Sequence, residues 1–139
     1  MQQAHSIFDL SVPVAPAAVI PYRGVDFTGA NISVAGAKGL GIAKRPAAAG
    51  QSFEAVVLGT AICEIGAAVL AGQPLSFDNL GRVVPALPLG VAAGAVAMTS
   101  AAANGAADLT GATLPQWVVG DALETNATVG SLIEVLLAR

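Results

Sequence analysis

The stretch that decides the fold is GQPLSFDNLGRVVPA, residues 72–86, because it has the pattern of an antiparallel hairpin. Two apolar runs, 74–77 and 82–85, flank the tetrapeptide Asp78-Asn79-Leu80-Gly81. Asp and Asn side chains can hydrogen-bond to their own backbone and Gly can take a positive φ, so we expect a loop of three or four residues. This turn fixes the register of the hairpin, which the small and similar side chains around it would discriminate poorly.

Short strand candidates recur along the rest of the chain. Helix signals are poor, because Gly, Pro and β-branched residues interrupt almost every window, and the best helical candidate is the Ala-rich part of 91–107. The strand candidates are 18–21, 39–43, 52–65 with a break or bulge near Gly59, 74–77, 82–85, 116–123 and 131–137. The sequence therefore predicts a mainly β fold, a small barrel or sandwich of short antiparallel hairpins.

An internal similarity links the segments that begin at Gly41 and Gly120. Each opens with a short Ala-containing strand, followed by a polar connection of similar length and a second glycine, Gly50 or Gly130. Four residues later a glutamate, Glu54 or Glu134, leads an apolar run. We interpret this pattern as a strand–loop–strand unit used twice, with Gly at the turn and Glu on a solvent face or rim.

Composition limits the partners that the chain can have. Only 11% of its 139 residues are charged and 55% are hydrophobic, yet aromatic residues make up 4%, so the apolar excess is mostly Ala and Val. Such a chain buries little volume per residue and gains from sharing surfaces with neighbours. With a net charge of −3 and six scattered basic residues, no nucleic-acid partner is expected.

No membrane span, signal peptide or intrachain disulfide is expected either. The uncharged stretch between Arg82 and Asp108 is interrupted by Pro and Gly and is rich in Ala, Thr and Ser. The N-terminus has no basic region, and Asp9 and Pro13 interrupt its apolar residues. Cys63 is the single cysteine. These features predict a soluble protein that is made inside the cell.

Residues for chemistry are scarce. His5, the one histidine, lies in the N-terminal segment, and Cys63 lies in a strand-like run where a buried inert thiol is expected. The glycine-rich GAKGLG, residues 36–41, matches neither phosphate-binding pattern and is soon followed by Pro46. Glu54 and Glu134 are expected to be solvated edge charges. We therefore predict no catalytic residue, no cofactor and no metal site.

At this point the residues resemble a family. The segment AGQPLSFDNLGRVVPA from Ala71, the G-x-A strands and the C-terminal EVLL are similar to the small capsid cement or head-decoration proteins of tailed bacteriophages. The resemblance covers about 39–139 and departs from the family at 1–22 and at the Ala-rich 91–114. It implies a non-enzymatic virion protein, made in the host cytoplasm, that binds the outside of the capsid. The implied partners are the major capsid protein and further copies of the chain, as a trimer or a dimer. We consider Glu54, Glu134, Arg82 and Arg139 candidates for contacts at the rim of this interface.

The N-terminal residues 1–22 are expected to form an extended arm ahead of a β-rich capsid-binding domain, 23–139. Pro13, Pro16 and Pro21 restrict the backbone and remove N–H donors, which disfavours a helix. The arm carries six large apolar residues that a lone domain has little reason to display: Ile7, Phe8, Leu10, Val12, Val14 and Val19. Two interpretations stay open for it, docking onto a neighbouring subunit or the capsid shell, and a disordered tail.

Two other classes of protein stay open at this stage. One is a secreted or surface-layer β-module for adhesion or assembly. The other is an enzyme whose active site consists of carboxylates alone. Gene neighbourhood separates the three, since a virion protein should lie beside a major capsid gene and an exported module beside an export system.

Overall fold

The computed structural model describes residues 4–87 and 116–137, and every regular element in these ranges is a β-strand. The mainly β prediction is therefore confirmed. The strands are β1 (Ser6–Val12), β2 (Gly24–Val25), β3 (Gly41–Ala43), β4 (Phe53–Glu64), β5 (Pro74–Phe77), β6 (Val83–Pro85), β7 (Gly120–Ala122) and β8 (Leu132–Leu137).

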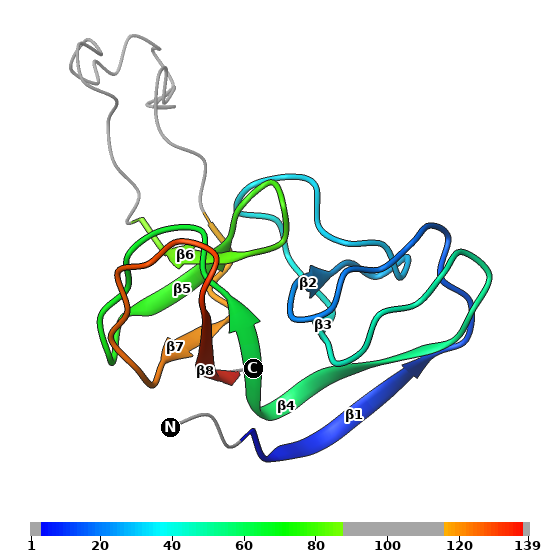
Figure 1. The fold of residues 1–139 in the computed structure, drawn as a ribbon, viewed down its shortest axis with the longest axis horizontal. Helices are drawn as coiled ribbons and strands as arrows, with labels where there is room; N and C mark the ends of the chain where they lie inside the picture. The colour runs from blue at the N-terminus through cyan, green and yellow to red at the C-terminus, as the bar shows by residue number, and fades with distance from the viewer. Residues whose placement is uncertain (1–3, 88–115, 138–139) are drawn as a thin grey trace, which may run out of the picture.

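The strands form one antiparallel sheet that curls into a barrel-like shape (Figure 1). Its order is β2-β3-β4-β8-β7-β5-β6, and β1 pairs with β4 outside this path. An isolated parallel bridge between Ile65, just after β4, and Val83 in β6 brings the two ends of the β4-to-β6 path together. The N–H of Gly66 donates to the carbonyl of Val83 at 2.8 Å beside it.

The long strand β4 belongs to both halves of the molecule. Its first part pairs with β1 and β3, and its second part, from Gly59, pairs with β8. Figure 1 shows β5 to β8 on one side of β4 and β2 and β3 on the other. Two hydrophobic cores result: a large one that includes Phe77 and Ile133, and a smaller, Ala-rich one that includes Phe53. The cores hold few aromatic rings, as the composition predicts.

The two halves repeat the same backbone hydrogen-bond pattern, which confirms and extends the strand–loop–strand similarity. Each half contains a pair of strands (β3 and β4, or β7 and β8) preceded by a strand that pairs with the first of them (β2 or β5). Three backbone N–H to carbonyl hydrogen bonds of the first unit have a counterpart in the second. Leu40 to Val25 corresponds to Val119 to Leu75, Tyr22 to Ala43 corresponds to Gly72 to Ala122, and Gly50 to Ala15 corresponds to Gly130 to Ile65. Ile65, just after β4, therefore corresponds to Ala15, so β4 is both the last strand of the first unit and the first strand of the second.

The central hairpin forms as predicted. Phe77 pairs with Val83, and the Asp78 N–H donates to the Arg82 carbonyl at 2.9 Å, so residues 79–81 form a three-residue tip. Gly81 has φ 74°, and the Asp78 carboxylate accepts hydrogen bonds from the N–H groups of Leu80 and Arg82. The side chain of the first turn residue thus closes the loop that its sequence predicted.

Other strand predictions need correction. Residues 18–21 contain one bridge residue, Val19, rather than a strand, and the strand predicted over 116–123 is limited to β7. The break predicted near Gly59 is confirmed, since the pairing of β1 with β4 shifts register there and Gly59 has φ 104°. β2, which has only two residues, was not predicted. The helical candidate 91–107 lies outside the described residues.

The N-terminal segment is extended, and β1 pairs along β4 of its own chain. The expectation that six apolar residues of the arm are displayed is wrong for two of them, because Val12 and Val19 are buried in the smaller core. Ile7, Phe8, Leu10 and Val14 are exposed. Docking of the arm onto a neighbour or a capsid shell stays a prediction.

Candidate interaction surface

β1 presents an apolar edge. It pairs with β4 alone among the described strands, so its other side is open to a further strand. Ile7 is 76% exposed and Phe8 is 54% exposed, and Leu58, which is opposite Phe8 on β4, is exposed as well. We call Ile7, Phe8, Leu10 and Leu58 the β1 edge. An exposed apolar edge strand is a surface that natural proteins avoid unless something covers it.

Gly59 is what lets β1 lie so close to β4. A Cβ atom at this residue would lie 2.5 Å from the carbonyl oxygen of His5 and 2.6 Å from the nitrogen of Ile7. Both neighbours are backbone atoms, so a side chain at Gly59 would push β1 away. The N–H of His5 and the N–H of Thr60 add hydrogen bonds at the same place, to Thr60 Oγ1 and the His5 carbonyl.

Within residues 4–87 and 116–137, ion pairs neutralise many of the charged side chains. Four such pairs are Arg23–Glu64, Lys44–Asp9, Arg45–Glu54 and Arg82–Asp78, each at 2.8 or 2.9 Å. Two of the candidate rim residues, Glu54 and Arg82, thus form ion pairs within the chain, with Arg45 and Asp78. Glu134 lies on β8 opposite Ile62, and Arg139 is outside the described residues. A rim role for these residues stays a prediction.

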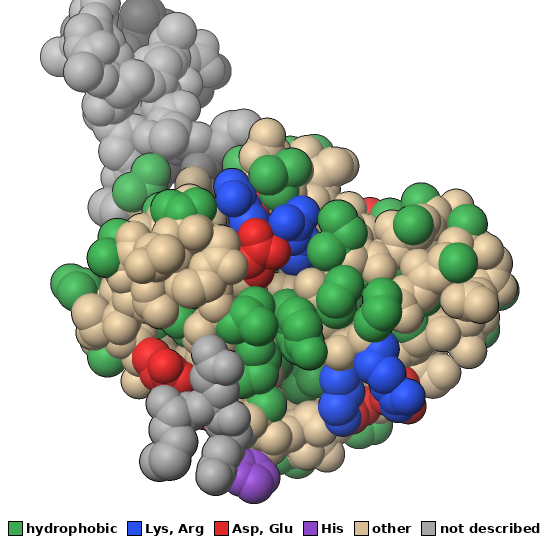
Figure 2. All heavy atoms as spheres, in the orientation of Figure 1, with side chains coloured by type: hydrophobic (Ala, Val, Ile, Leu, Met, Phe, Trp, Pro, Cys, Tyr) green, Lys and Arg blue, Asp and Glu red, His purple; other side chains and the backbone are tan. Residues whose placement is uncertain are grey.

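Hydrophobic side chains gather over the middle of one face, between two groups of charged side chains (Figure 2). The start of the described chain, at Ala4 and Ser6, borders a shallow hollow of about 60 Å³ that is also lined by Tyr22 and Ile62. Local charges beside this hollow cancel in the Lys44–Asp9 pair. This face therefore offers a neutral and largely apolar contact surface.

Tyr22 is the one non-glycine residue with positive φ among the described residues, at 61°. The equivalent residue of the second unit is Gly72, with φ 79°, and the other pair of matching turns also has glycine at the positive-φ residue, Gly50 and Gly130, with φ 83° and 86°. A tyrosine here costs about 1–2 kcal/mol relative to an ordinary backbone conformation. Strain of this kind persists where the surroundings fix it and where the side chain is useful. Sequence reasoning missed Tyr22, although aligning the turns would have revealed the missing glycine.

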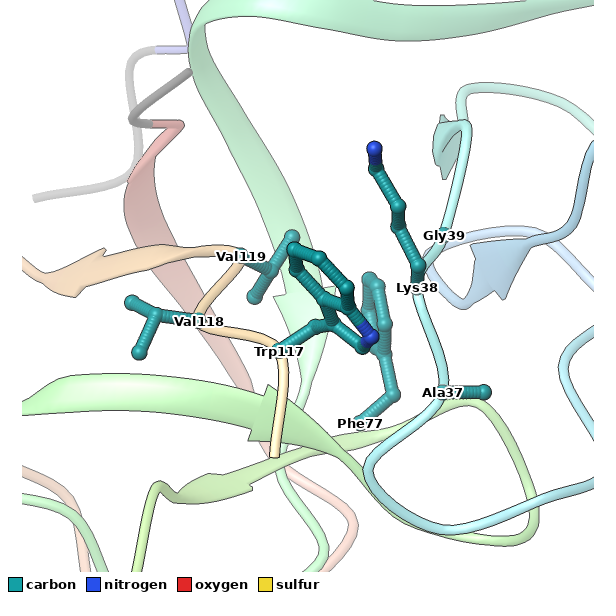
Figure 3. A pocket seen from close by; sticks show the side chains of 7 residues that line it. All are labelled: Ala37, Lys38, Gly39, Phe77, Trp117, Val118 and Val119. Atoms are coloured by element: carbon teal, nitrogen blue, oxygen red, sulfur yellow. The ribbon is translucent and has the colours of Figure 1, made fainter. Parts of the chain in front are cut away.

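A pocket of about 360 Å³ lies where the two halves of the molecule meet (Figure 3). Residues 37–39 form one wall, residues 117–119 form the facing wall, and Phe77 lies between them. The Gly36 N–H donates to the Phe77 carbonyl at 2.7 Å, and the Trp117 N–H donates to the Gly36 carbonyl at 3.1 Å. The glycine-rich 36–41 thus builds a pocket wall, which its sequence did not reveal.

Cys63 is buried in the larger core, and burial raises the pKa of its thiol well above the usual range. The thiolate is the reactive form, so we expect folded protein at pH 8 to resist a thiol reagent such as DTNB and denatured protein to react with one equivalent. The absorbance of the chromophore that DTNB releases measures the number of reacted thiols in the folded and in the denatured protein. Rapid labelling of the folded protein would contradict the buried position.

No group of three or more potential metal ligands occurs within residues 4–87 and 116–137. In the same ranges the structure has no helix long and apolar enough to cross a membrane. The candidate surfaces of this part of the chain are thus the β1 edge, the neutral face and the pocket. A small barrel-like β domain with an exposed apolar edge strand is typical of a protein that attaches to another protein.

The chain belongs to the phage cement protein family, whose model matches residues 3–115. It is thus a structural, capsid-associated phage protein. The match includes the N-terminal arm and stops before β7, whereas the sequence resemblance was placed over 39–139. The fold is also similar to the crystal structure of the head fiber gp8.5 N base of bacteriophage phi29, with TM-score 0.63 and 15% identity over 94% of this chain and 95% of that one. No curated protein matches.

Proposed function

We propose that this protein binds the outer surface of a phage capsid and stabilises the head, with the β1 edge as its docking element. The exposed apolar side chains of this edge strand carry the proposal, taken together with membership of the cement family. A capsid segment could pair with the open side of β1 and cover Ile7 and Phe8. Such strand addition supplies main-chain hydrogen bonds for affinity and side-chain contacts for specificity.

The composition of the surface supports attachment to a lattice of equivalent sites. Removing apolar, low-charge surface from water costs little desolvation energy, and the nearby charges are already paired within the chain. Copies that bridge adjacent capsomers, as trimers or dimers, gain further through multivalency. Binding to the assembled shell alone stabilises it by mass action. In this proposal residues 1–22 are the arm, whose β1 edge contacts the capsid together with the capsid-binding domain 23–139, and the protein moves from the host cytoplasm to the virion surface.

The double variant Ile7→Ser/Phe8→Ser is expected to bind heads that lack the protein at least about tenfold more weakly. Each exposed side chain that becomes fully buried contributes about 1.5–3 kcal/mol, and about 1.4 kcal/mol corresponds to a tenfold change in affinity. Copies per head, counted by quantitative gel analysis after sedimentation at subsaturating protein, measure the loss. Heads carrying the variant should also open at the lower temperature of undecorated heads.

The matched control is Leu70→Ser/Val129→Ser, which removes two apolar side chains of similar exposure away from β1. Wild-type occupancy for this control would assign the loss to the β1 edge. If wild-type protein fails to bind heads or leaves their heat resistance unchanged, the proposed function is wrong. If both double variants bind equally well, the protein docks through another surface.

A further inference from the structure

Lys38 differs from the other basic side chains of the described residues. Arg23, Lys44, Arg45 and Arg82 each form an ion pair with a carboxylate, and Lys38 forms none within residues 4–87 and 116–137. Its Nζ atom lies 4.9 Å from the centroid of the Trp117 ring and 6.0 Å from that of Phe27. Cation–π contacts of this kind leave an ammonium group able to bind an anion from outside the chain.

The aromatic side chains around Lys38 are exposed, unlike the ring below them. Trp117 is 58% exposed and Phe27 is 60% exposed, whereas Phe77 is buried beneath the pocket. Large aromatic rings on the surface beside a pocket are typical of contact sites, because they supply apolar area at low conformational cost. Figure 3 shows Lys38 and Trp117 on facing segments of chain, with Phe77 between them.

Two features hold this arrangement in place. The Asp26 carboxylate accepts hydrogen bonds from the Thr28 hydroxyl at 2.6 Å and from the N–H groups of Thr28 and Ala30, and so orders the turn that carries Phe27. Partial burial raises the pKa of Asp26, but these hydrogen bonds outweigh it and lower the pKa overall. On the facing wall, Gln116 Oε1 accepts hydrogen bonds from Ser76 Oγ and the Leu87 N–H.

We propose that this pocket binds a segment of the capsid shell protein that presents a large apolar side chain next to a carboxylate. The apolar group would fill the space between the two walls above Phe77, and the carboxylate would pair with Lys38. A volume of about 360 Å³ is at the low end for ligand pockets and suits one large side chain rather than a cofactor. The proposal rests on the proposed function for the identity of the partner.

Charge complementarity selects this occupant. The chain has a net charge of −3, so an unpaired lysine inside an apolar pocket is a local exception that favours an acidic partner. A purely apolar segment would leave the ammonium group without an anion, and a free phosphate would leave Trp117 and Val119 without apolar contact. A segment that presents an apolar side chain next to a carboxylate meets both the apolar walls and the ammonium group of Lys38.

Intrinsic fluorescence tests the pocket directly, because Trp117 is the only tryptophan of the chain. Titration with Ac-Asp-Phe-NH₂ should shift the emission, and Ac-Asn-Phe-NH₂ and Ac-Asp-Ala-NH₂ should each bind about tenfold more weakly. Lys38→Gln should remove the preference for Asp over Asn, whereas the control Arg45→Gln should keep it. Equal binding of the three peptides, or no binding of the first, would overturn the proposal.

Occupancy of heads identifies the partner. Trp117→Ala and Lys38→Glu are expected to lower the number of copies per head about tenfold at subsaturating protein. Leu70→Glu, at an exposed residue away from the β1 edge and from the pocket, is the control for an added negative charge. If wild-type protein binds and the two pocket variants bind equally well, the pocket proposal is overturned and the proposed function stands. If wild-type protein does not bind, both fail together. Emission that changes with the protein's own concentration would place a second copy in the pocket and overturn the capsid assignment.

Discussion

Replacing Gly120 with alanine should destabilise the fold by at least about 3 kcal/mol. Gly120 lies in β7, between β8 and β5, and a Cβ atom there would lie within 2.0 Å of the Leu136 carbonyl oxygen and 3.0 Å of the Leu137 Cα. Both neighbours are backbone atoms of the paired strand, so relief requires β7 and β8 to separate. Equilibrium unfolding in urea, followed by circular dichroism, measures the loss.

Two further variants distinguish a steric clash between strands from the backbone penalty of a positive φ. Gly41→Ala repeats the clash in the first unit, with the Val56 carbonyl oxygen 2.3 Å from the added Cβ, and should cost a similar amount. Gly50→Ala meets nothing within 4 Å, but Gly50 has φ 83°, so only the backbone penalty of about 1–2 kcal/mol applies. Equal losses for Gly120→Ala and Gly50→Ala would contradict the close approach of the strands.

The sequence predicts local elements well where the turn chemistry is explicit. The hairpin of β5 and β6 depends on Asp78 and Gly81, whose conformational preferences act over four residues and need no tertiary contact. β4 is predicted because its apolar and β-branched run is long. β2 is not predicted, since two residues carry no periodicity and the strand exists only through its pairing with β3.

The doubling of the fold was only partly visible in the sequence. Gly50 and Gly130 mark equivalent turns, so the pairs β3–β4 and β7–β8 could be aligned. The first strand of the second unit is the second part of β4, which also ends the first unit. A strand with two roles has no boundary in the sequence, and β1 was therefore interpreted as an arm rather than as the matching first strand.

The candidate site could not be assembled from the sequence. Lys38 and Trp117 are far apart along the chain, and their contact depends on the backbone hydrogen bonds that Gly36 forms with Phe77 and Trp117. Because Lys38 and Trp117 meet only in the folded chain, their contact produces no recognisable spacing in the sequence. Pairing of Lys44 with Asp9 and of Arg45 with Glu54 likewise depends on tertiary structure, and it is what distinguishes Lys38 from the other basic residues.

Phe77→Ala is expected to cost about 3–5 kcal/mol, the usual range for a buried phenylalanine. The ring is 1% exposed and lies between two glycines, since Cβ atoms built on Gly24 and Gly39 would come within 2.5 and 2.6 Å of its carbons. Phe77 is in β5 of the second unit and these glycines belong to the first. The ring therefore packs the two halves against each other, and its loss leaves a cavity that backbone on both sides cannot easily fill.

Phe27→Ala provides the matched control, because it makes the same chemical change at an exposed ring and should alter the free energy of unfolding by no more than about 0.5 kcal/mol. Urea unfolding of both variants, followed by circular dichroism and by Trp117 emission, compares them. Trp117 and Phe77 line the same pocket, so the emission of folded Phe77→Ala should also differ from that of the wild type. If Phe77→Ala unfolds at the same urea concentration as Phe27→Ala, the Phe77 ring does not join the two halves, and β4 must hold them together with the backbone hydrogen bonds between the units, such as those of Gly36.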